Sequence, residues 1–486
     1  MLMKRLVKLV VVIVLFAAAS SASGQTVSQH PRVKQALNLL KVWLDAQRDY
    51  DQIPGLSAAV VHNQDLIWSG GFGFADVEHK TPATAQTLYS ICSISKLFTS
   101  IAVMQLRDAG KLRLDDPVGR HLSWFTIKRS DPQSAEITIE GLLTHASGLP
   151  RESDFPYWTG PDFKFPSREQ VIEQLSKQET LYPAETYFQY SNLGLTLAGE
   201  VVAAASGQPY ATYVRQHILD PIGLRSTAPE MPEQERGHKL ATGYSALRRV
   251  GGRVPVTFFE ARGIAPAAGY ASSAEDLARF ASWQLRVLGR KGGEEVLKSN
   301  TLREMQRVHW VDPDFETTWG LGFSVWRNEG KTFVGHGGSC PGFRTHLLLK
   351  TDENVATIFM TNAQGVNAGD FAQRIYDIVG PAIKEAIKSS SPAKQPAFDT
   401  SRYTGSYETG FAGETAIVEW EDGLAALSLP TANPMRGLTK LKKVGEHTFR
   451  RIRSDESLGE LITFEMGPDG RAARLIWHSN QYRRVR

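Results

Sequence analysis

Residues 90–100 run Ser90-Ile-Cys-Ser-Ile-Ser-Lys-Leu-Phe-Thr-Ser100 and contain the S-x-x-K tetrad Ser93-Ile94-Ser95-Lys96. Apolar residues recur after it at helical spacing, which predicts a helix over residues 93–109. Residues i and i+3 of a helix share one face, so Ser93 and Lys96 are expected to touch beside the positive end of the helix dipole. A serine nucleophile needs a base within reach and help with negative charge, and this stretch offers both.

The tetrad alone is weak evidence for a catalytic site. A chain of this length and ordinary composition contains roughly one or two S-x-x-K matches by chance. A second match, Ser391-Pro-Ala-Lys394, lies within residues 389–396, whose serines and prolines predict a linker. The argument for catalysis therefore has to come from the rest of the chain.

Length and composition describe a globular protein of 486 residues, which predicts one large domain and a smaller one. A net charge of +4 favours neither a nucleic-acid partner nor a membrane surface. The two cysteines, Cys92 and Cys340, are too few for a disulfide scaffold or for a zinc site built of cysteines. We expect no metal and no organic cofactor.

The N-terminus has the three-part pattern of a secretory signal. Basic residues precede an apolar run over residues 9–19, and small residues follow it. The pattern predicts a signal peptide over residues 1–24 with cleavage before Gln25, and an uncleaved anchor is the alternative. The mature chain is expected to have no transmembrane segment and to be periplasmic or secreted.

Hydrophobic periodicity divides the remaining chain into a first domain over residues 25–388 and a second over residues 397–486. Helices are predicted in the first domain at 31–50, 168–179, 191–205, 209–219, 272–288 and 368–387. Strands are predicted there at 56–61, 66–68, 320–326, 332–336, 345–350 and 355–361. This order predicts one sheet closed by strands from both ends of the domain, with a helical insert between them.

Three shorter patterns complete the organisation. Ser272 and Glu275 have the spacing of a capping box. Residues 151–166 are rich in aromatic residues, glycine and proline, which predicts an irregular loop that either lines a pocket or packs on itself. Short alternating strands follow the linker and predict an antiparallel barrel or sandwich, at 405–407, 416–420, 424–429, 448–453, 461–466 and 473–478.

Three further motifs carry side chains suited to acyl transfer. In Tyr190-Ser191-Asn192, the tyrosine can act as a base where cationic neighbours lower its pKa, and the asparagine can orient Lys96. His336-Gly337-Gly338-Ser339 closes a predicted strand, where small residues admit a substrate backbone and N–H groups can complete an oxyanion hole. The structural alternative for the first motif is a helix cap that follows a core tyrosine. The structural alternative for the second motif is a glycine-rich hairpin.

The third motif is Leu142-Leu-Thr-His-Ala-Ser-Gly-Leu-Pro150, which places His145 at the end of a short apolar helix. A Ser-His-Asp triad through His145 is one interpretation. A buried, hydrogen-bonded structural histidine is the interpretation that the apolar surroundings favour.

Taken in order, the motifs S-x-x-K, L-L-T-H-x-S-G-L-P, Y-x-N and H-x-G resemble those of the serine β-lactamase and penicillin-binding-protein superfamily. Over residues 33–387 the chain is most similar to class C-like β-lactamases, D-aminopeptidases, DD-carboxypeptidases and family VIII esterases. The second domain looks, more loosely, like the lipocalin-like domains of some members. The resemblance implies an α+β domain, in which helices flank an antiparallel sheet beside an all-helical region, followed by a β-barrel or sandwich.

The resemblance also implies roles for the matched residues. Ser93 would be the acylated nucleophile, Lys96 would help to deprotonate it, and Tyr190 would act as the general base or relay to it. The N–H groups of Ser93 and Ser339 would form the oxyanion hole. The substrate-binding residues would be Asn192, His336, Gly337, Gly338 and Ser339.

One residue departs from the pattern of the β-lactam-binding members. His336 stands where they have the lysine of a K-T-G motif, which binds the substrate carboxylate. Histidine is partly neutral near pH 7 and binds that group less well. The departure favours a peptidase or an esterase over a β-lactamase, although β-lactam hydrolysis stays open.

The same resemblance suggests a structural role for the two cysteines. Cys92 directly precedes Ser93, and Cys340 follows Gly338 by two residues. Certain carbapenem-hydrolysing class A β-lactamases have a disulfide at the two equivalent places. The resemblance therefore implies a Cys92–Cys340 disulfide, with two buried free thiols as the alternative.

The sequence predicts an exported serine hydrolase that forms an acyl-enzyme on an amide or ester bond of a D-amino-acid peptide, a β-lactam or a small ester. The alternative is a catalytically weak or inactive penicillin-binding-like protein that binds cell-wall peptides. The expected partner is a small molecule or a peptide. The sequence names neither the substrate, nor the oligomeric state, nor the role of the second domain.

Overall fold

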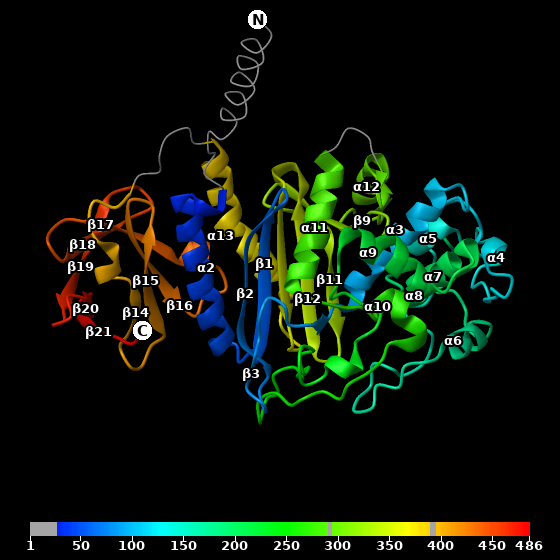
Figure 1. Ribbon diagram of the computed structural model, residues 1–486, viewed down its shortest axis with the longest axis horizontal. Coiled ribbons are helices and arrows are strands. Elements are labelled where there is room, and N and C mark those ends of the chain that lie inside the picture. Colours follow the sequence, from blue (N-terminus) through cyan, green and yellow to red (C-terminus); the bar gives the residue numbers. More distant parts are fainter. Residues whose placement is uncertain (1–26, 290–293, 389–394) are drawn as a thin grey trace, which may run out of the picture.

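The computed structural model describes residues 27–289, 294–388 and 395–486. At the centre of its first domain is a nine-stranded antiparallel sheet in the order β3-β2-β1-β13-β12-β11-β10-β9-β8 (Figure 1). Its strands are β1 (Gly55–His62), β2 (Asp65–Asp76), β3 (Thr81–Pro82), β8 (Trp310–Val311), β9 (Thr318–Trp319), β10 (Ser324–Asn328), β11 (Lys331–Cys340), β12 (Phe343–Lys350) and β13 (Val355–Thr361). Because β1 pairs with β13, strands from both ends of the domain close the sheet, which confirms the predicted topology.

Helices cover both faces of this sheet. Helices α2 (Pro31–Tyr50) and α13 (Ala368–Lys388) pack together on one face, and α11 (Ala274–Gly289) packs on the other. Successive side chains of a strand point to opposite faces, so Ala59 and Val61 join the core on one side while Ala58 and Val60 join the core on the other. A strand that is buried on both faces usually has a nearly continuous apolar sequence. Every residue of β1 is buried, and its sequence follows this pattern.

The helical region is inserted between β3 and β8 and lies at the end of the molecule opposite the barrel (Figure 1). Helix α3 (Ser95–Asp108) runs through it, and every residue from Ser95 to Met104 is buried. A single 3-10 turn, η2 (Cys92–Ile94), leads into α3, so the α-helix begins two residues later than predicted. The other helices are α4 (Val118–His121), α5 (Ile139–Thr144), α6 (Arg168–Leu175), α7 (Asn192–Ser206), α8 (Tyr210–Val214), α9 (Asp220–Ile222), α10 (Ala265–Ala268) and α12 (Ser299–Gln306).

The second domain is a closed antiparallel barrel, which decides between the predicted barrel and sandwich. Side chains fill its interior, including Tyr403, Tyr407, Phe449 and Phe464. Its strands are β14 (Gly405–Glu408), β15 (Glu414–Trp420), β16 (Gly423–Leu429), β17 (Leu438–Lys443), β18 (Thr448–Ile452), β19 (Leu458–Met466), β20 (Ala472–Trp477) and β21 (Asn480–Arg484).

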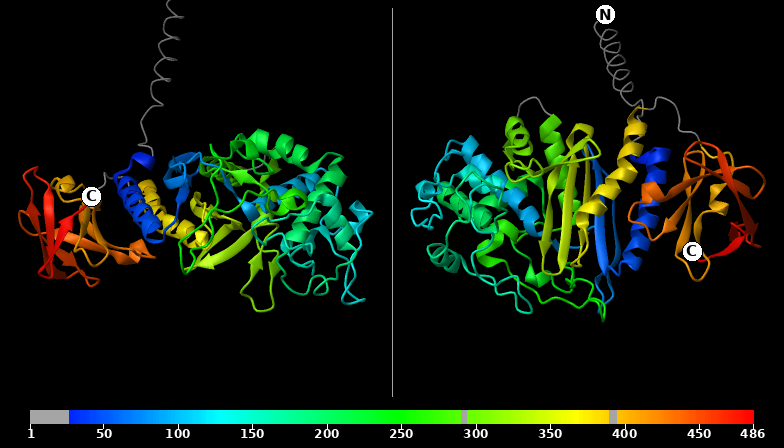
Figure 2. Two further views of the ribbon diagram at one scale, coloured as in Figure 1. Left: turned by 90° about the horizontal axis from the view of Figure 1, so that it is seen from below. Right: turned by 180° about the vertical axis from the view of Figure 1, so that it is seen from behind.

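The barrel packs against α2, on the side of α2 and α13 that faces away from the sheet (Figures 1 and 2). Gln35 of α2 and Glu421 exchange two hydrogen bonds of 2.9 Å, from the Gln35 side chain to the Glu421 carbonyl and from the Glu421 N–H to the Gln35 side chain. Trp43 Nε1 donates to the carbonyl of Thr431 at 2.9 Å. These contacts and the shared apolar core fix the barrel to the first domain.

Some predicted elements need correction. The predicted capping box at Ser272 and Glu275 is wrong, because β5 (Ala271–Ser272) pairs with β4 (Tyr89–Ser90) and helix α11 starts later. Ser273 Oγ accepts the N–H of Asp276 at 3.2 Å in its place. The predicted strand over 320–326 starts only at Ser324, since residues 320–323 form a turn closed by the N–H of Gly320 and the carbonyl of Phe323.

The predicted signal peptide over residues 1–24 lies outside the described residues. The same holds for residues 389–394 of the predicted linker, which include the second S-x-x-K match. Within the three described ranges, no helix is both long and apolar enough to cross a membrane.

Candidate active site

Ser93 lies in the turn η2, immediately before α3, and contributes to the wall of a cavity. Cys92 before it has a φ of 51°, a left-handed conformation that costs a non-glycine residue about 1–2 kcal/mol. A disulfide joins Cys92 to Cys340 at the end of β11, with the two Cα atoms 5.7 Å apart. The turn that carries Ser93 is therefore tied covalently to the strand that carries Ser339.

Close packing also brings β11 against this turn. A Cβ atom added to Gly338 would collide with the carbonyl oxygen of Ile91 and with Oγ1 of Thr345. The Thr345 hydroxyl itself donates to the Ile91 carbonyl at 3.2 Å. Glycine is required at position 338 so that β11 can approach the turn that carries Ser93.

Gly338→Ala is therefore expected to lower the free energy of unfolding by about 1–3 kcal/mol, the usual cost of overpacking. Gly337→Ala is the matched control for stability, because the tightest contact of a Cβ there is with Nδ1 of the His346 side chain at 3.1 Å and its other contacts are ordinary ones. Denaturant unfolding of both variants compares the two costs. Equal stability of the two variants would contradict this account of Gly338.

The disulfide makes a separate prediction about stability. The double variant Cys92→Ser, Cys340→Ser is expected to lose about 2–4 kcal/mol, because the bond closes a long loop in the unfolded chain. A reducing agent should bring the unfolding midpoint of the wild-type protein down to that of the double variant. The double variant should not respond to the reductant. A reductant effect of equal size on both proteins would contradict the role given to this bond.

Lys96 lies one helical turn beyond Ser93 and is fully buried. Its Nζ lies 3.2 Å from Ser93 Oγ, as the i, i+3 spacing predicts. The same Nζ donates to Asn192 Oδ1 at 2.7 Å and to the carbonyl of Ala267 at 2.8 Å. Burial lowers the pKa of Lys96 well below its ordinary value. A neutral amine has two N–H groups for these two acceptors and a lone pair left for the Ser93 hydroxyl.

Tyr190 lies between the basic side chains of Lys96 and Arg151. Lys96 Nζ and Arg151 Cζ are each 4.9 Å from the centre of its ring. Burial nevertheless raises the pKa of the Tyr190 hydroxyl, against the lowering effects of its hydrogen bond with Ser93 and of Arg151. The hydroxyl is therefore neutral at rest and does not have the lowered pKa that the phenolate base considered from the sequence would require.

Asn192 begins helix α7, with Ser191 as its N-cap. Its Oδ1 accepts from Lys96, and its Nδ2 donates to Glu152 Oε1 at 2.8 Å. Glu152 also accepts from the Tyr157 hydroxyl and lies 3.2 Å from Arg151 Nε. The Asn192 side chain thus positions the amine of Lys96 in this structure, which is one of the two roles that the sequence suggested for it.

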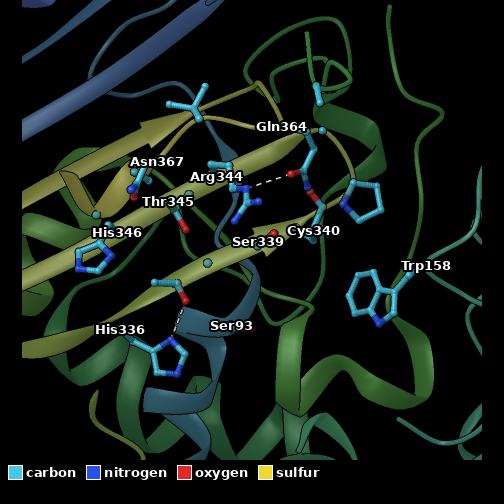
Figure 3. A pocket seen from close by; sticks show the side chains of 18 of the residues that line it. Ser93, Trp158, His336, Ser339, Cys340, Arg344, Thr345, His346, Gln364 and Asn367 are labelled. Atoms are coloured by element: carbon cyan, nitrogen blue, oxygen red, sulfur yellow. Dashed lines mark hydrogen bonds between the residues drawn. The ribbon is translucent and has the colours of Figure 1, made fainter. Parts of the chain in front are cut away.

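His336 lies on β11 and lines the cavity, with its side chain 3% exposed. Burial lowers the pKa of His336 to about 3. The imidazole is therefore neutral at physiological pH, and Nδ1 lies 2.6 Å from the carbonyl oxygen of Gly337 (Figure 3). A neutral ring cannot replace the charge of a lysine, which strengthens the departure noted from the sequence.

His145 occupies a structural position. It ends helix α5 in the left-handed conformation, is fully buried, and accepts the N–H of Ser191 at Nδ1 over 3.1 Å. Its ring lies 4.4 Å from the ring of Tyr190, centre to centre. The side chain supports Tyr190 and the start of α7, so the structure favours the interpretation of a buried structural histidine.

The cavity has a volume of about 920 Å³. Ser93, Tyr190, Asn192 and the stretch His336–Ser339 line one part of it, and Trp158 and Phe163 of the irregular loop line another. None of its lining residues comes from the barrel within the described part of the chain, so the second domain does not cover this opening. Strand β11 pairs with β10 only as far as Gly335, which leaves the backbone edge of His336–Cys340 open beside Ser93.

Three charged residues of the site belong to none of the motifs that the sequence analysis identified. Arg151 and Glu152 directly follow the L-L-T-H-x-S-G-L-P motif, and their position in the chain is the single clue that could have drawn attention to them. Arg344 lies on β12 and also lines the cavity. Their contacts with Tyr190, Asn192 and Gln364 join segments that are distant in sequence.

A family model described as Beta-lactamase matches residues 43–379, well over half of the chain. The chain belongs to the beta-lactamase family. Among curated proteins, Beta-lactamase-like protein 2 of Dictyostelium discoideum is 26% identical over 352 residues, which cover 71% of this chain and 63% of that protein. Protein flp of Staphylococcus aureus (strain MW2) is 27% identical over 313 residues, which cover 64% of this chain and 60% of that protein. This beta-lactamase family member therefore spans less than two thirds of the length of these two relatives.

Solved structures confirm the predicted fold. The octameric penicillin-binding protein homologue from Pyrococcus abyssi aligns with a TM-score of 0.63 at 23% identity, over 92% of this chain and 99% of that one. The D-amino acid amidase from Ochrobactrum anthropi SV3 aligns with a TM-score of 0.59 at 23% identity, over 73% of this chain and 98% of that one. This beta-lactamase family member shares its fold with both of these proteins.

Proposed function

We propose that this protein is a serine hydrolase that cleaves an amide or ester bond through an acyl-enzyme on Ser93. The observation that carries the proposal is the contact of 3.2 Å between Ser93 Oγ and Lys96 Nζ, with Lys96 buried and its pKa lowered. A serine hydroxyl is a weak nucleophile and needs an adjacent neutral base. Lys96 is that base, and Asn192 and the Ala267 carbonyl hold its amine in place.

Acylation begins when the Ser93 hydroxyl gives its proton to the neutral amine of Lys96 and Oγ bonds to the substrate carbonyl carbon. The backbone N–H groups of Ser93 and Ser339 are the proposed donors to the oxyanion that forms. As the C–N or C–O bond breaks, the leaving group takes the hydroxyl proton of Tyr190. The proton held by Lys96 then restores that hydroxyl.

Deacylation uses the same groups in reverse. Water attacks the acyl carbon and gives a proton to Lys96, and Ser93 Oγ leaves with a proton to regenerate the hydroxyl. The products are a carboxylic acid and free enzyme. Within the protein the protons pass through Ser93, Lys96 and Tyr190, and the remaining transfers are to the leaving group and from the attacking water.

The open edge of β11 supports an acyl part with a peptide-like backbone. Free backbone groups beside Ser93 can pair with an extended substrate as an added strand would. The aromatic side chains of Trp158 and Phe163 offer an apolar wall in the same cavity. D-amino-acid peptides and small esters remain the proposed substrates, with β-lactams as a third class, and export through residues 1–24 remains a prediction.

A fluorophosphonate probe tests the proposal directly, because an activated serine attacks its phosphorus and displaces fluoride, which leaves a stable phosphonyl adduct. Intact-mass analysis of the purified protein should show one adduct, and peptide mapping should place it on Ser93. Ser93→Ala should remain unlabelled, and Ser95→Ala should still be labelled at Ser93, since the Ser95 hydroxyl is committed to its own hydrogen bonds with the Cys92 carbonyl and the Tyr270 N–H.

A binding protein without catalysis is the alternative that this experiment separates. Such a protein would give no adduct with the fluorophosphonate, with a fluorescent penicillin or with an activated ester. That outcome would overturn the proposed hydrolase and favour a penicillin-binding-like protein that binds cell-wall peptides.

A further inference from the structure

Glu152 lies two residues after the L-L-T-H-x-S-G-L-P motif, beside the start of α7, and the proposed reaction gives it no step. Backbone hydrogen bonds hold this segment in place. The carbonyl of Arg151 accepts the N–H of Asn192 at 2.8 Å and the N–H of Leu193 at 3.2 Å. The carbonyl of Glu152 accepts from Gln178 Nε2 at 2.9 Å. The main chain at Glu152 is therefore fixed relative to the residue that carries the Asn192 side chain.

The carboxylate of Glu152 is held at both of its oxygens. Oε1 accepts from Asn192 Nδ2 at 2.8 Å and lies 3.2 Å from Arg151 Nε. Oε2 accepts from the hydroxyl of Tyr157, a fully buried residue. Burial raises the pKa of that hydroxyl, so it stays a donor. The Glu152 side chain is only 20% exposed, and these three partners set its position.

The amide of Asn192 has an oxygen and a nitrogen of nearly equal size, and either end fits beside Lys96. An ionised carboxylate only accepts hydrogen bonds, so Glu152 binds the Nδ2 end and turns Oδ1 toward Lys96. Lys96 Nζ then donates to Asn192 Oδ1 at 2.7 Å and to the Ala267 carbonyl at 2.8 Å. Because both N–H groups of the neutral amine are engaged, its lone pair is left for the Ser93 hydroxyl.

The reversed orientation of this amide would disable the base. Nδ2 would then face a neutral amine and would donate to the lone pair of Lys96, which is the lone pair that has to receive the Ser93 proton. The amide oxygen would face the Glu152 carboxylate, and a buried acceptor would be left unpaired at a cost in free energy. The acceptor-only character of Glu152 therefore selects the one amide orientation in which Lys96 can act as base.

Two charged side chains also act on the amine of Lys96. Burial is the largest cause of its lowered pKa, the charge of Glu152 opposes that lowering, and the charge of Arg151 adds to it. The remaining titratable side chains that face the amine in the described part of the chain are neutral, namely His145 and His336, whose pKa values burial lowers, and Tyr190, whose pKa burial raises. The charge of Glu152 thus affects the pH at which Lys96 becomes neutral.

We propose that Glu152 is a positioning residue for the acylation of Ser93, and that it acts through Asn192 by fixing the orientation of the Asn192 amide. The inference rests on the proposed serine hydrolase and adds a residue to its machinery. Glu152 does not contact the reacting atoms. It keeps the lone pair of Lys96 directed at Ser93, and its negative charge shifts the pH range in which that lone pair is available.

Glu152→Gln tests the inference, because glutamine keeps the size of the side chain but donates hydrogen bonds as well as accepting them. The kcat/KM for 4-nitrophenyl acetate on its high-pH plateau should fall about 10- to 100-fold, since the Asn192 amide is no longer restricted to one orientation. The acid limb of the profile should move to lower pH, because the change removes a negative charge that favours the protonated amine of Lys96.

Glu185→Gln is the matched control for the loss of charge. Glu185 is an exposed glutamate of the loop before Tyr190 and lies outside the cavity wall. This variant should keep the wild-type plateau and the wild-type acid limb. Arg151→Gln removes the opposite charge and should move the acid limb to higher pH, because the charge of Arg151 lowers the pKa of Lys96.

Asn192→Ala separates the two effects of Glu152. In this background the amide is absent, so adding Glu152→Gln should cause no further loss on the plateau, whereas the acid limb should still move to lower pH. A neutron crystal structure of the deuterated wild-type protein tests the orientation without any variant. It should place both deuterium atoms of the Asn192 amide on the end that faces Glu152.

The outcomes separate this inference from the proposed function. An unchanged plateau in Glu152→Gln, an equal loss with and without the Asn192 side chain, or amide deuterium atoms that face Lys96 would overturn the positioning role and leave the hydrolase in place. An acid limb that does not move in Glu152→Gln would overturn the effect assigned to its charge. Hydrolysis of no ester by the wild-type protein, together with no fluorophosphonate adduct, would overturn the hydrolase and the positioning role together.

Discussion

Replacing Lys96 with methionine is expected to lower kcat/KM for an activated ester by about 10²–10⁴-fold, the range that general-base catalysis usually contributes. Methionine fills a similar volume but cannot accept the proton of the Ser93 hydroxyl. The loss should fall on acylation, so the rate of fluorophosphonate labelling should drop in parallel with kcat/KM. Stopped-flow release of 4-nitrophenol and the labelling rate measure the two effects.

The second S-x-x-K tetrad of the chain supplies the control for this experiment. Lys394→Met removes the lysine of an identical sequence pattern in the predicted linker and should leave kcat/KM unchanged. Thermal unfolding of Lys96→Met is needed beside it, because the change leaves Asn192 Oδ1 and the Ala267 carbonyl without their donor. A folded Lys96→Met that acylates at the wild-type rate would contradict the role of Lys96 as base.

The pH dependence of kcat/KM follows from the same lysine. Its pKa in the folded protein is well below the ordinary value because of burial, so the amine becomes neutral at a pH well below 10.5. The base is active when unprotonated, and the rate should therefore rise with pH through the lowered pKa and then level off. His336 does not shape this limb near neutral pH, because its pKa is about 3. A limb centred near 10.5 would contradict the lowered pKa.

Tyr190→Phe is expected to reduce hydrolysis of an amide by about 10²–10³-fold and hydrolysis of a 4-nitrophenyl ester far less. The Tyr190 hydroxyl is a neutral donor whose pKa is raised by burial, so its proposed task is to protonate the leaving group. An amine leaving group requires that proton, whereas 4-nitrophenolate leaves without it. Phenylalanine keeps the ring between Lys96 and Arg151 and removes only the hydroxyl.

Rates for a D-alanyl 4-nitroanilide and for 4-nitrophenyl acetate measure this difference. Tyr187→Phe is the matched control, since Tyr187 is an exposed tyrosine of the same loop and its change should affect neither substrate. An equal loss on both substrates would assign Tyr190 to the activation of Ser93 rather than to the leaving group.

Local rules of sequence predict much of the fold and the centre of the site. The i, i+3 spacing places Lys96 beside Ser93 without knowledge of any other segment. Helix α2 is predicted with its observed bounds, because its apolar period is regular and a proline occupies its first position. The start of α3 is misplaced by two residues, because the left-handed conformation of Cys92 depends on packing and has no local signal.

Strands β17 and β21 are not predicted from the sequence, for a related reason. Their sequences, Leu-Thr-Lys-Leu-Lys-Lys and Asn-Gln-Tyr-Arg-Arg, are dominated by charged and polar residues that face solvent. Neighbouring strands of the closed barrel supply their hydrogen bonds and impose their extended conformation. Barrel closure is a property of the whole domain, and short windows of sequence do not contain it.

The charged residues of the site show a further limit. Glu152 contacts Asn192, and Arg344 contacts Gln364, only because loops and strands converge at the cavity. Among the described residues, Arg344 forms no ion pair with an acidic side chain. No sequence pattern encodes that lack, since it depends on every side chain that surrounds the guanidinium.

The pairing of β1 with β13 sets the order in which the molecule can be completed during synthesis. Nearly three hundred residues separate these two neighbouring strands of the sheet. At the usual speed of translation, roughly 15–60 s pass between the emergence of the first strand and that of its partner. During that interval one edge of β1 has unpaired backbone groups that can associate with other chains. The finished site therefore belongs to no smaller folding unit, and its assembly has to wait until most of the polypeptide has been made.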